Sequence, residues 1–214
     1  MGLKLYFLRH GQTAYSRNGG YCGTSKNDPG LTLEGEEMAQ AFADSYRHLE
    51  WVAAFVSPLK RAIQTATPIC AHAGIKMQLR RGLQEIDYGK WEGMHPNHIS
   101  QKYHDDYVRW LTDPAWNAPL GGERGIDIAR RASLVLEEIE HLYSEGNILL
   151  VSHKATIRIM LCELMGIDIG RYRDRFAMPV AAVSLVELSR RGPLFHLIAD
   201  RSHLSPYLKS LPNT

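Results

Sequence analysis

The chain has few cysteines and no long apolar run. Its 214 residues include only three cysteines, at positions 22, 70 and 162, which cannot all pair within one molecule. Cys70 and Cys162 lie in apolar helical patterns, which predicts reduced core residues and a cytoplasmic protein. No apolar stretch reaches the length of a membrane span, and the chain opens on a predicted strand. We therefore expect no membrane segment and no signal peptide.

An excess of one charge is also missing. The formal net charge is +2, and no run of lysine or arginine exceeds two residues. The composition therefore gives no support for a nucleic-acid or membrane partner. The chain lacks internal repeats and low-complexity linkers, and 44% of its residues are hydrophobic, which suits one catalytic domain over residues 1–205. Residues 206–214 contain two prolines and are expected to form a loose C-terminal tail.

The signatures of three other classes of site are missing. No Gly-x-x-x-x-Gly-Lys-Ser/Thr motif is present, which excludes a P-loop kinase. A cysteine phosphatase built on Cys22 would need an arginine six residues later, where the chain has Asp28. His95, His98 and His104 form a histidine cluster without a carboxylate or thiolate partner at a defined spacing, so we assign no metal ligands.

What the chain does have is a strand that ends in an arginine and a histidine. Residues 3–8 form a buried strand pattern, and Arg9, His10 and Gly11 follow. Such strand ends are where an open α/β sheet presents functional groups to a ligand. Arginine can bind a phosphate through two parallel hydrogen bonds, and histidine can attack phosphorus. The structural alternative is a turn histidine beside a surface charge.

Two more strand ends carry similar groups. The apolar run 148–151 ends in Ser152 and His153, and a helix is expected to follow. The strand 52–56 leads into Ser57 and Pro58, a predicted N-cap and first helical residue.

That helix start places Arg61 in the first helical turn, where backbone N–H groups also favour an anion. Three strand ends thus supply a cationic set suited to a phosphoryl dianion, made of Arg9, His10, Arg61 and His153.

A fourth segment offers a proton donor. Glu85, Asp87 and Glu92 follow the strand-like run 77–83. A leaving alkoxide needs a general acid, and repulsion from nearby phosphate oxygens favours the protonated form of a carboxyl. Glu85 lies closest to the strand end and is our candidate, with Asp87 and Glu92 as alternatives.

The order of elements predicts an α/β fold. Strands alternate with helices, and the last two strands form a hairpin, which is typical of a three-layer α/β/α sandwich with a mostly parallel central sheet. Residues 94–120 are rich in aromatic residues and prolines, and we expect them to form an inserted lid region. The helices are predicted over 32–49, 58–74 and 123–145, and the hairpin strands over 180–188 and 194–199.

Taken together, these segments resemble the histidine phosphatase superfamily, also called the phosphoglycerate mutase-like superfamily. The shared motifs occur in the family's order and span about three-quarters of the chain, and together they are far more specific than any one alone. They are Arg9-His10-Gly11 with Thr13, Ser57-Pro58 to Arg61-Ala62 and Thr65-Ala66, Glu85 with Gly89 and Trp91-Glu92-Gly93, Gly121-Gly122-Glu123, and Ser152-His153.

The resemblance implies His10 as a nucleophile that becomes phosphorylated, Glu85 as general acid, and Arg9, Arg61 and His153 around the phosphate. Three positions depart from the family pattern. Ser16 stands near a usual phosphate-binding asparagine, and we assign that contact to it. Lys154 replaces a common glycine, and we count it among the phosphate-binding candidates because it would add charge to the pocket; the alternative is a side chain that points away. Arg124 replaces a frequent serine, so the start of the following helix is expected to differ.

Phosphatase and mutase share the steps up to phosphohistidine. The segment 94–120 is shorter than the mutase insertion and contains one arginine, Arg109, so the resemblance favours a metal-independent phosphatase. It would act on a small phosphorylated metabolite and need no cofactor. A cofactor-dependent mutase, which would need bisphosphoglycerate, is the alternative, and an inactive phosphate-binding module is a remote one. Arg17, Lys26, Arg109 and Lys154 are candidates to bind the rest of the substrate, and a homodimer is left open.

Overall fold

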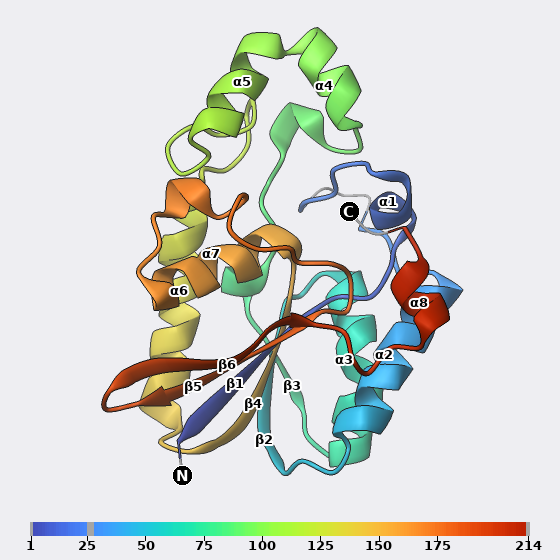
Figure 1. The fold of residues 1–214 in the computed structure, drawn as a ribbon, viewed down its shortest axis with the longest axis vertical. Coiled ribbons are helices and arrows are strands. Elements are labelled where there is room, and N and C mark those ends of the chain that lie inside the picture. Colours follow the sequence, from blue (N-terminus) through green and yellow to red (C-terminus); the bar gives the residue numbers. More distant parts are fainter. Residues whose placement is uncertain (1, 25–27, 213–214) are drawn as a thin grey trace.

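The computed structural model describes residues 2–24 and 28–212, in which six strands form one mixed sheet (Figure 1). The strand order is β3-β2-β4-β1-β5-β6. The pairs β2–β3, β2–β4 and β1–β4 are parallel, whereas β1–β5 and β5–β6 are antiparallel, which confirms the mostly parallel sheet and the terminal hairpin. The strands are β1 (Leu3–Arg9), β2 (Trp51–Val56), β3 (Met77–Leu79), β4 (Gly146–Ser152), β5 (Val183–Ser189) and β6 (Gly192–Asp200).

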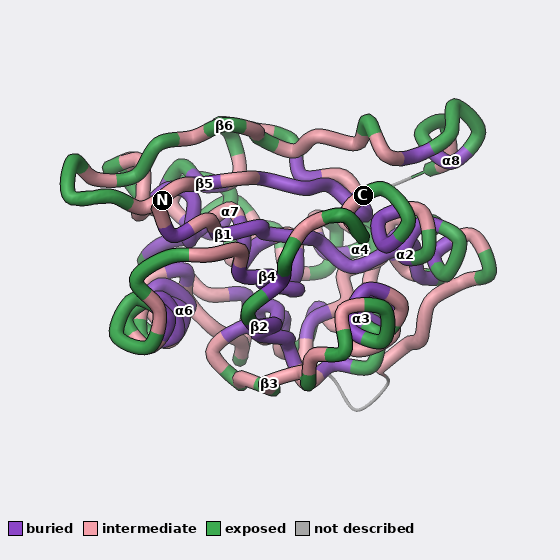
Figure 2. The backbone as a smooth tube through the Cα atoms, turned by 90° about the horizontal axis from the view of Figure 1, so that it is seen from below, coloured by how far each residue is buried: buried purple, intermediate pink, exposed green. Residues whose placement is uncertain are grey.

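Helices cover both faces of the sheet, and the predicted three-layer sandwich is confirmed (Figures 1 and 2). Leu5 and Phe7 of β1 pack with α6 (Gly125–Leu142) and α7 (Lys154–Met165). Tyr6 and Leu8 pack on the other face with α2 (Leu33–Tyr46) and α3 (Lys60–Ala73). This alternation follows from the two-residue period of a strand, and each fully buried leucine or phenylalanine contributes about 1.5–3 kcal/mol.

A third cluster builds the lid beyond the sheet (Figure 1). The lid contains α4 (Pro96–Lys102) and α5 (His104–Thr112), which lie within the predicted segment 94–120. Trp91 and Trp110 are fully buried and meet edge to face, with ring centroids 5.5 Å apart. Most aromatic residues of this region therefore form the lid's own core. Three 3-10 turns join these elements, η1 (Arg81–Leu83), η2 (Gly89–Trp91) and η3 (Ile169–Arg171), and a short helix α1 (Ala14–Asn18) follows β1.

The helix starts agree with the sequence in one case and not in another. The helix predicted over 32–49 is α2, and Thr32 caps its start by accepting a hydrogen bond from Gly35 N. Ser57 was predicted to cap α3, but this helix begins at Lys60 after an N-cap at Leu59 that makes no side-chain capping bond. The reason is a competing partner, because the Ser57 hydroxyl lies 2.7 Å from Nε2 of His153.

The expected loose tail is wrong for the part of it that the structure describes. Residues Pro206–Ser210 form the short helix α8, capped by the hydroxyl of Ser205. Leu208 is buried in a cluster with Met38, Val180, Ala181 and Leu204. A side-chain bond also fixes the segment, since Nε2 of Gln12 donates to Pro212 O over 2.9 Å. The prolines do not oppose this helix, because Pro206 is its first residue, a position that suits proline, and Pro212 lies beyond its end.

Cys70 and Cys162 are buried and unpaired, as predicted, and Cys22 is half-buried and unpaired as well. Across the described residues, no helix combines the length and the apolar character that crossing a membrane requires.

Candidate active site

His10 follows β1 and is held by the backbone of its neighbours. Its N–H donates to Ser152 O over 3.1 Å, and its carbonyl accepts from Ala181 N over 3.1 Å. A side chain at Gly11 would not fit, because a Cβ atom there would lie 2.5 Å from Gly35 O. The glycine after the histidine is therefore needed for close backbone packing.

The imidazole ring of His10 has its Nδ1 bound to the backbone, so Nε2 is the nitrogen available for reaction. Nδ1 lies 2.7 Å from Gly11 O, and since a carbonyl only accepts, Nδ1 carries the proton and Nε2 keeps its lone pair. Burial, together with the charges of Arg61 and Arg9, holds the pKa of His10 well below its usual range. The imidazole is therefore neutral at physiological pH, which is the form that can act as a nucleophile.

His153 lies beside it at the start of α7. The two imidazole centroids are 5.1 Å apart, and His153 is completely buried. Burial and the charge of Arg61 hold the pKa of His153 well below its usual range as well. The prediction that two histidines from separate strand ends converge is confirmed.

Two arginines flank the histidines. Arg61, in the first turn of α3, is fully buried and pairs with Asp28 through Nη1 and Oδ1 at 2.9 Å. Asp28 also accepts from the N–H of Lys60, so one carboxylate holds both the helix start and the arginine. Arg9 donates to Met178 O, and burial lowers its pKa to about 9, which leaves it charged at neutral pH. The sequence did not predict Asp28 as the partner of Arg61, because the two residues lie far apart along the chain.

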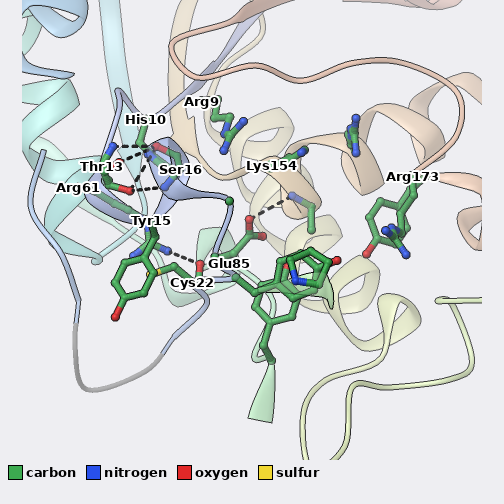
Figure 3. A pocket seen from close by; sticks show the side chains of 18 of the residues that line it. Arg9, His10, Thr13, Tyr15, Ser16, Cys22, Arg61, Glu85, Lys154 and Arg173 are labelled. Atoms are coloured by element: carbon green, nitrogen blue, oxygen red, sulfur yellow. Dashed lines mark hydrogen bonds between the residues drawn. The ribbon is translucent and has the colours of Figure 1, made fainter. Parts of the chain in front are cut away.

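Glu85 is a buried carboxylate at the beginning of α7. Its Oε1 accepts from Ile86 N and Thr156 N over 3.0 and 3.3 Å, and its Oε2 accepts from Ala155 N over 3.2 Å. His153, the N-cap residue, makes no capping bond, so Glu85 supplies the acceptors that the helix end needs. The same carboxylate lines the pocket beside His10 (Figure 3).

Of the remaining candidates, Ser16 and Lys154 also line the pocket. The hydroxyl of Ser16 accepts from Thr13 N over 2.8 Å in a reciprocal cap of α1, so part of its capacity is used within the loop. Lys154 points into the pocket region rather than away from it (Figure 3). Burial beside Arg9 and Arg158 lowers its pKa to about 7.

Two predicted substrate-binding residues are not brought into this pocket. Arg17 is exposed on α1, and Arg109 is exposed on α5, where it pairs with Asp106. Lys26 lies outside the described residues. His95, His98 and His104 are exposed, and His95 caps α4 by accepting from Asn97 N. In the part of the chain that the structure describes, no three histidine, cysteine or acidic side chains gather as a metal site would require.

The pocket has a volume of about 400 Å³ and contains residues that the sequence did not single out. Arg158 lies one helical turn after Lys154, and this spacing was the available signal. Arg173 follows η3 in a segment without a regular pattern, and nothing in the sequence pointed to it. The aromatic side of the pocket is formed by Tyr15, Tyr21, Tyr88, Trp110 and Tyr172.

Comparison with known proteins agrees with this geometry. The profile of the histidine phosphatase superfamily (branch 1) matches residues 5–201. The chain belongs to the histidine phosphatase superfamily. The predicted resemblance is thereby confirmed, and so is the expectation of an enzyme that hydrolyses phosphate esters.

Several relatives of this histidine phosphatase carry names that state an activity. Phosphoserine phosphatase 1 of Hydrogenobacter thermophilus is 28% identical over 207 residues, which cover 96% of each chain. Adenosylcobalamin/alpha-ribazole phosphatase of Escherichia coli is 26% identical and covers 94% of this chain and 97% of its own. The fold matches the crystal structure of a putative alpha-ribazole-5'-P phosphatase from E. coli, with a TM-score of 0.85 at 23% identity over 94% and 98% of the two chains.

Proposed function

We propose that this protein hydrolyses a phosphomonoester of a small metabolite through a phosphohistidine on Nε2 of His10, without a metal ion. One observation carries the proposal: His10 is neutral, keeps the lone pair of Nε2, and lies between Arg9 and Arg61 in a closed-in pocket. Buried guanidinium groups stabilise the charge of a transferring phosphoryl group without reorganisation at the moment of reaction.

The reaction needs two steps. In the first, the Nε2 lone pair of His10 attacks phosphorus, the bond from phosphorus to the ester oxygen breaks, and the carboxyl of Glu85 gives that oxygen a proton. In the second, the Glu85 carboxylate takes a proton from water, the water oxygen attacks phosphorus, and the bond from phosphorus to Nε2 breaks. Inorganic phosphate and neutral His10 result. His153 and the two arginines stabilise the phosphoryl oxygens in both steps.

The test is to trap the phosphoenzyme. A rapid quench in base after mixing with a labelled phosphomonoester should leave an acid-labile phosphate on wild-type protein. His10→Ala should abolish both this adduct and turnover, while His153→Ala should cripple turnover by removing transition-state stabilisation. Near-normal activity of His10→Ala, with the adduct lost in His153→Ala, would reverse the roles of the two histidines.

The mutase alternative predicts a different fate for the same intermediate. Adding bisphosphoglycerate and monophosphoglycerate should yield isomerised product if a bound acid, rather than water, takes the phosphoryl group. A non-catalytic phosphate-binding module would give neither free phosphate nor an adduct. The named relatives above support the phosphatase.

A cytoplasmic location and a homodimer also stay predictions. Three unpaired thiols support the first. Sedimentation of the purified protein would test the second.

A further inference from the structure

The pocket contains more positive charge than one reacting phosphate requires. Arg9 and Arg61 lie next to His10, and three further cations, Lys154, Arg158 and Arg173, line the same cavity. Figure 3 shows Arg173 across the pocket from His10 and Arg61, with Lys154 between them. A phosphoryl group on His10 therefore leaves the far part of this cationic wall unused.

These three cations lack the carboxylate partners that Arg61 and Arg131 have. Arg61 pairs with Asp28, and Arg131 pairs with Glu123 at 2.8 Å. Within residues 2–24 and 28–212, by contrast, Lys154, Arg158 and Arg173 form no ion pair and no side-chain hydrogen bond. The Nε atom of Arg158 is buried without any acceptor in that part of the chain.

The acidic side chains of the pocket compensate this charge only in part, because Glu85 attracts Lys154 and Arg158 electrostatically but forms no ion pair with either. Both oxygens of Glu85 are occupied by N–H groups at the beginning of α7. Asp174 lies 3.9 Å from Arg171 and pairs with that residue instead. A ligand that carries negative charge would compensate the rest.

Two features of these cations favour the binding of an anion: like charges repel on α7, and Arg173 is already anchored. Lys154 and Arg158 are one turn apart on the same face of α7, an arrangement of like charges that destabilises a helix by itself. The guanidinium of Arg173 lies over the ring of Trp110, 3.8 Å from its centroid, which anchors it to the lid. An anion that binds between them would relieve this repulsion, and little side-chain entropy would be lost on ordering Arg173.

We infer that Lys154, Arg158 and Arg173 bind a second anionic group, a carboxylate or a second phosphate, on the same small molecule whose phosphate reacts at His10. This assignment rests on the proposed function and defines its substrate class as phosphomonoesters that carry another negative charge. The aromatic side chains of Tyr88, Trp110 and Tyr172 line the pocket with these cations and fit the short carbon skeleton that joins the two charges.

The experiment compares matched substrates that differ only in the second charge. One pair is 3-phosphoglycerate and glycerol 3-phosphate, which share a three-carbon skeleton, and a longer pair is carboxyphenyl phosphate and phenyl phosphate. Propanediol bisphosphate against propyl phosphate tests a phosphate in place of the carboxylate. Because a charge-assisted hydrogen bond is strong, we expect kcat/KM to favour the doubly charged member of at least one pair by about tenfold or more.

Variants then assign the preference to named residues. Arg158→Gln and Arg173→Gln should each lower kcat/KM for the ester with the second charge far more than kcat/KM for its partner without that charge, and Arg158→Lys should restore part of the preference. Arg109→Gln, an exposed arginine outside the pocket, is the matched control and should keep the full preference.

Two results would overturn the inference. One is equal kcat/KM for both members of every pair in the wild-type protein. The other is an equal fall in kcat/KM, in the two glutamine variants, for the esters with and without the second charge. That result would give Arg158 and Arg173 a structural role. In both cases esters are still hydrolysed through His10. Absence of hydrolysis of all six esters together with absence of the phosphohistidine adduct would instead contradict the proposed function itself.

Discussion

Replacing Glu85 with glutamine should separate two roles of this carboxylate, the proposed delivery of a proton and the capping of α7. In the wild-type protein Oε1 accepts from Ile86 N and Thr156 N, and Oε2 accepts from Ala155 N. A glutamine has only one oxygen. If that oxygen takes the place of Oε1, the new NH₂ group faces the N–H of Ala155, and a buried donor is left without an acceptor.

The two roles predict effects of different size. A buried N–H without a partner lowers the free energy of unfolding by about 1–3 kcal/mol. Loss of the general acid slows attack on an alkyl phosphate by about 10²–10⁴-fold, whereas nitrophenyl phosphate hardly needs a proton on its leaving group and should be slowed much less. Stability and leaving-group dependence therefore report on separate functions of one side chain.

The assay is single-turnover formation of the phosphoenzyme, because Glu85 is also expected to activate the water in the second step. Wild-type protein and Glu85→Gln are compared on both esters, and urea unfolding is followed in parallel. Asp87→Asn is the control, since Asp87 is exposed and does not line the pocket. Equal slowing of both esters by Glu85→Gln would refute its role as proton donor and would leave Glu85 with a structural role in the pocket.

Two further predictions follow from the charges of the site and the core. Activity should survive exhaustive EDTA treatment and be inhibited by vanadate, which mimics five-coordinate phosphorus; loss on chelation that Mg²⁺ or Zn²⁺ restores would exclude the metal-free mechanism. His203 packs against the rings of Phe42 and Tyr46, and burial lowers its pKa from 6.5 to about 4. Because the unfolded chain takes up this proton first, the free energy of unfolding should fall as the pH drops from 6.5 towards 4. His203→Leu should reduce the slope of the free energy of unfolding against pH by about one proton, which is ~1.4 kcal/mol per pH unit. Urea unfolding at several pH values measures it, and an unchanged slope would show that His203 is not held neutral.

The sequence predicted the reacting half of the site because that half is built from strand ends. Arg9 and His10 end β1, His153 follows β4, and Arg61 follows β2, and these three strands are adjacent and parallel. Parallel strands bring their carboxyl ends to one edge of the sheet, so a local pattern of apolar strand and polar end is enough to place the groups together. The segment 94–120 and the terminal hairpin could also be predicted from the sequence, because amino-acid composition and the spacing of apolar residues are local properties of the chain.

The other half of the pocket depended on tertiary packing. Arg17 and Arg109 were expected to bind substrate, but both are exposed on the short helices α1 and α5 outside the pocket. Arg158 and Arg173 fill that part of the wall instead. The spacing of Lys154 and Arg158 places both on one face of α7. The direction in which that face points, and the path of the chain after η3 that brings in Arg173, depend on tertiary packing.

The helix caps show the same difference between local contacts, which the sequence predicts, and long-range contacts, which it does not. Thr32 caps its own helix through a bond to a residue three positions away, and a local motif predicts such a bond. Ser57 instead pairs with His153, and Glu85 caps α7 from about seventy residues away, because folding brings these groups together. The sequence by itself therefore determined the fold class, the family and the groups around the reacting phosphate. Only the tertiary structure decided which distant partners hold those groups and which cations line the rest of the pocket, because these contacts join segments that lie far apart along the chain.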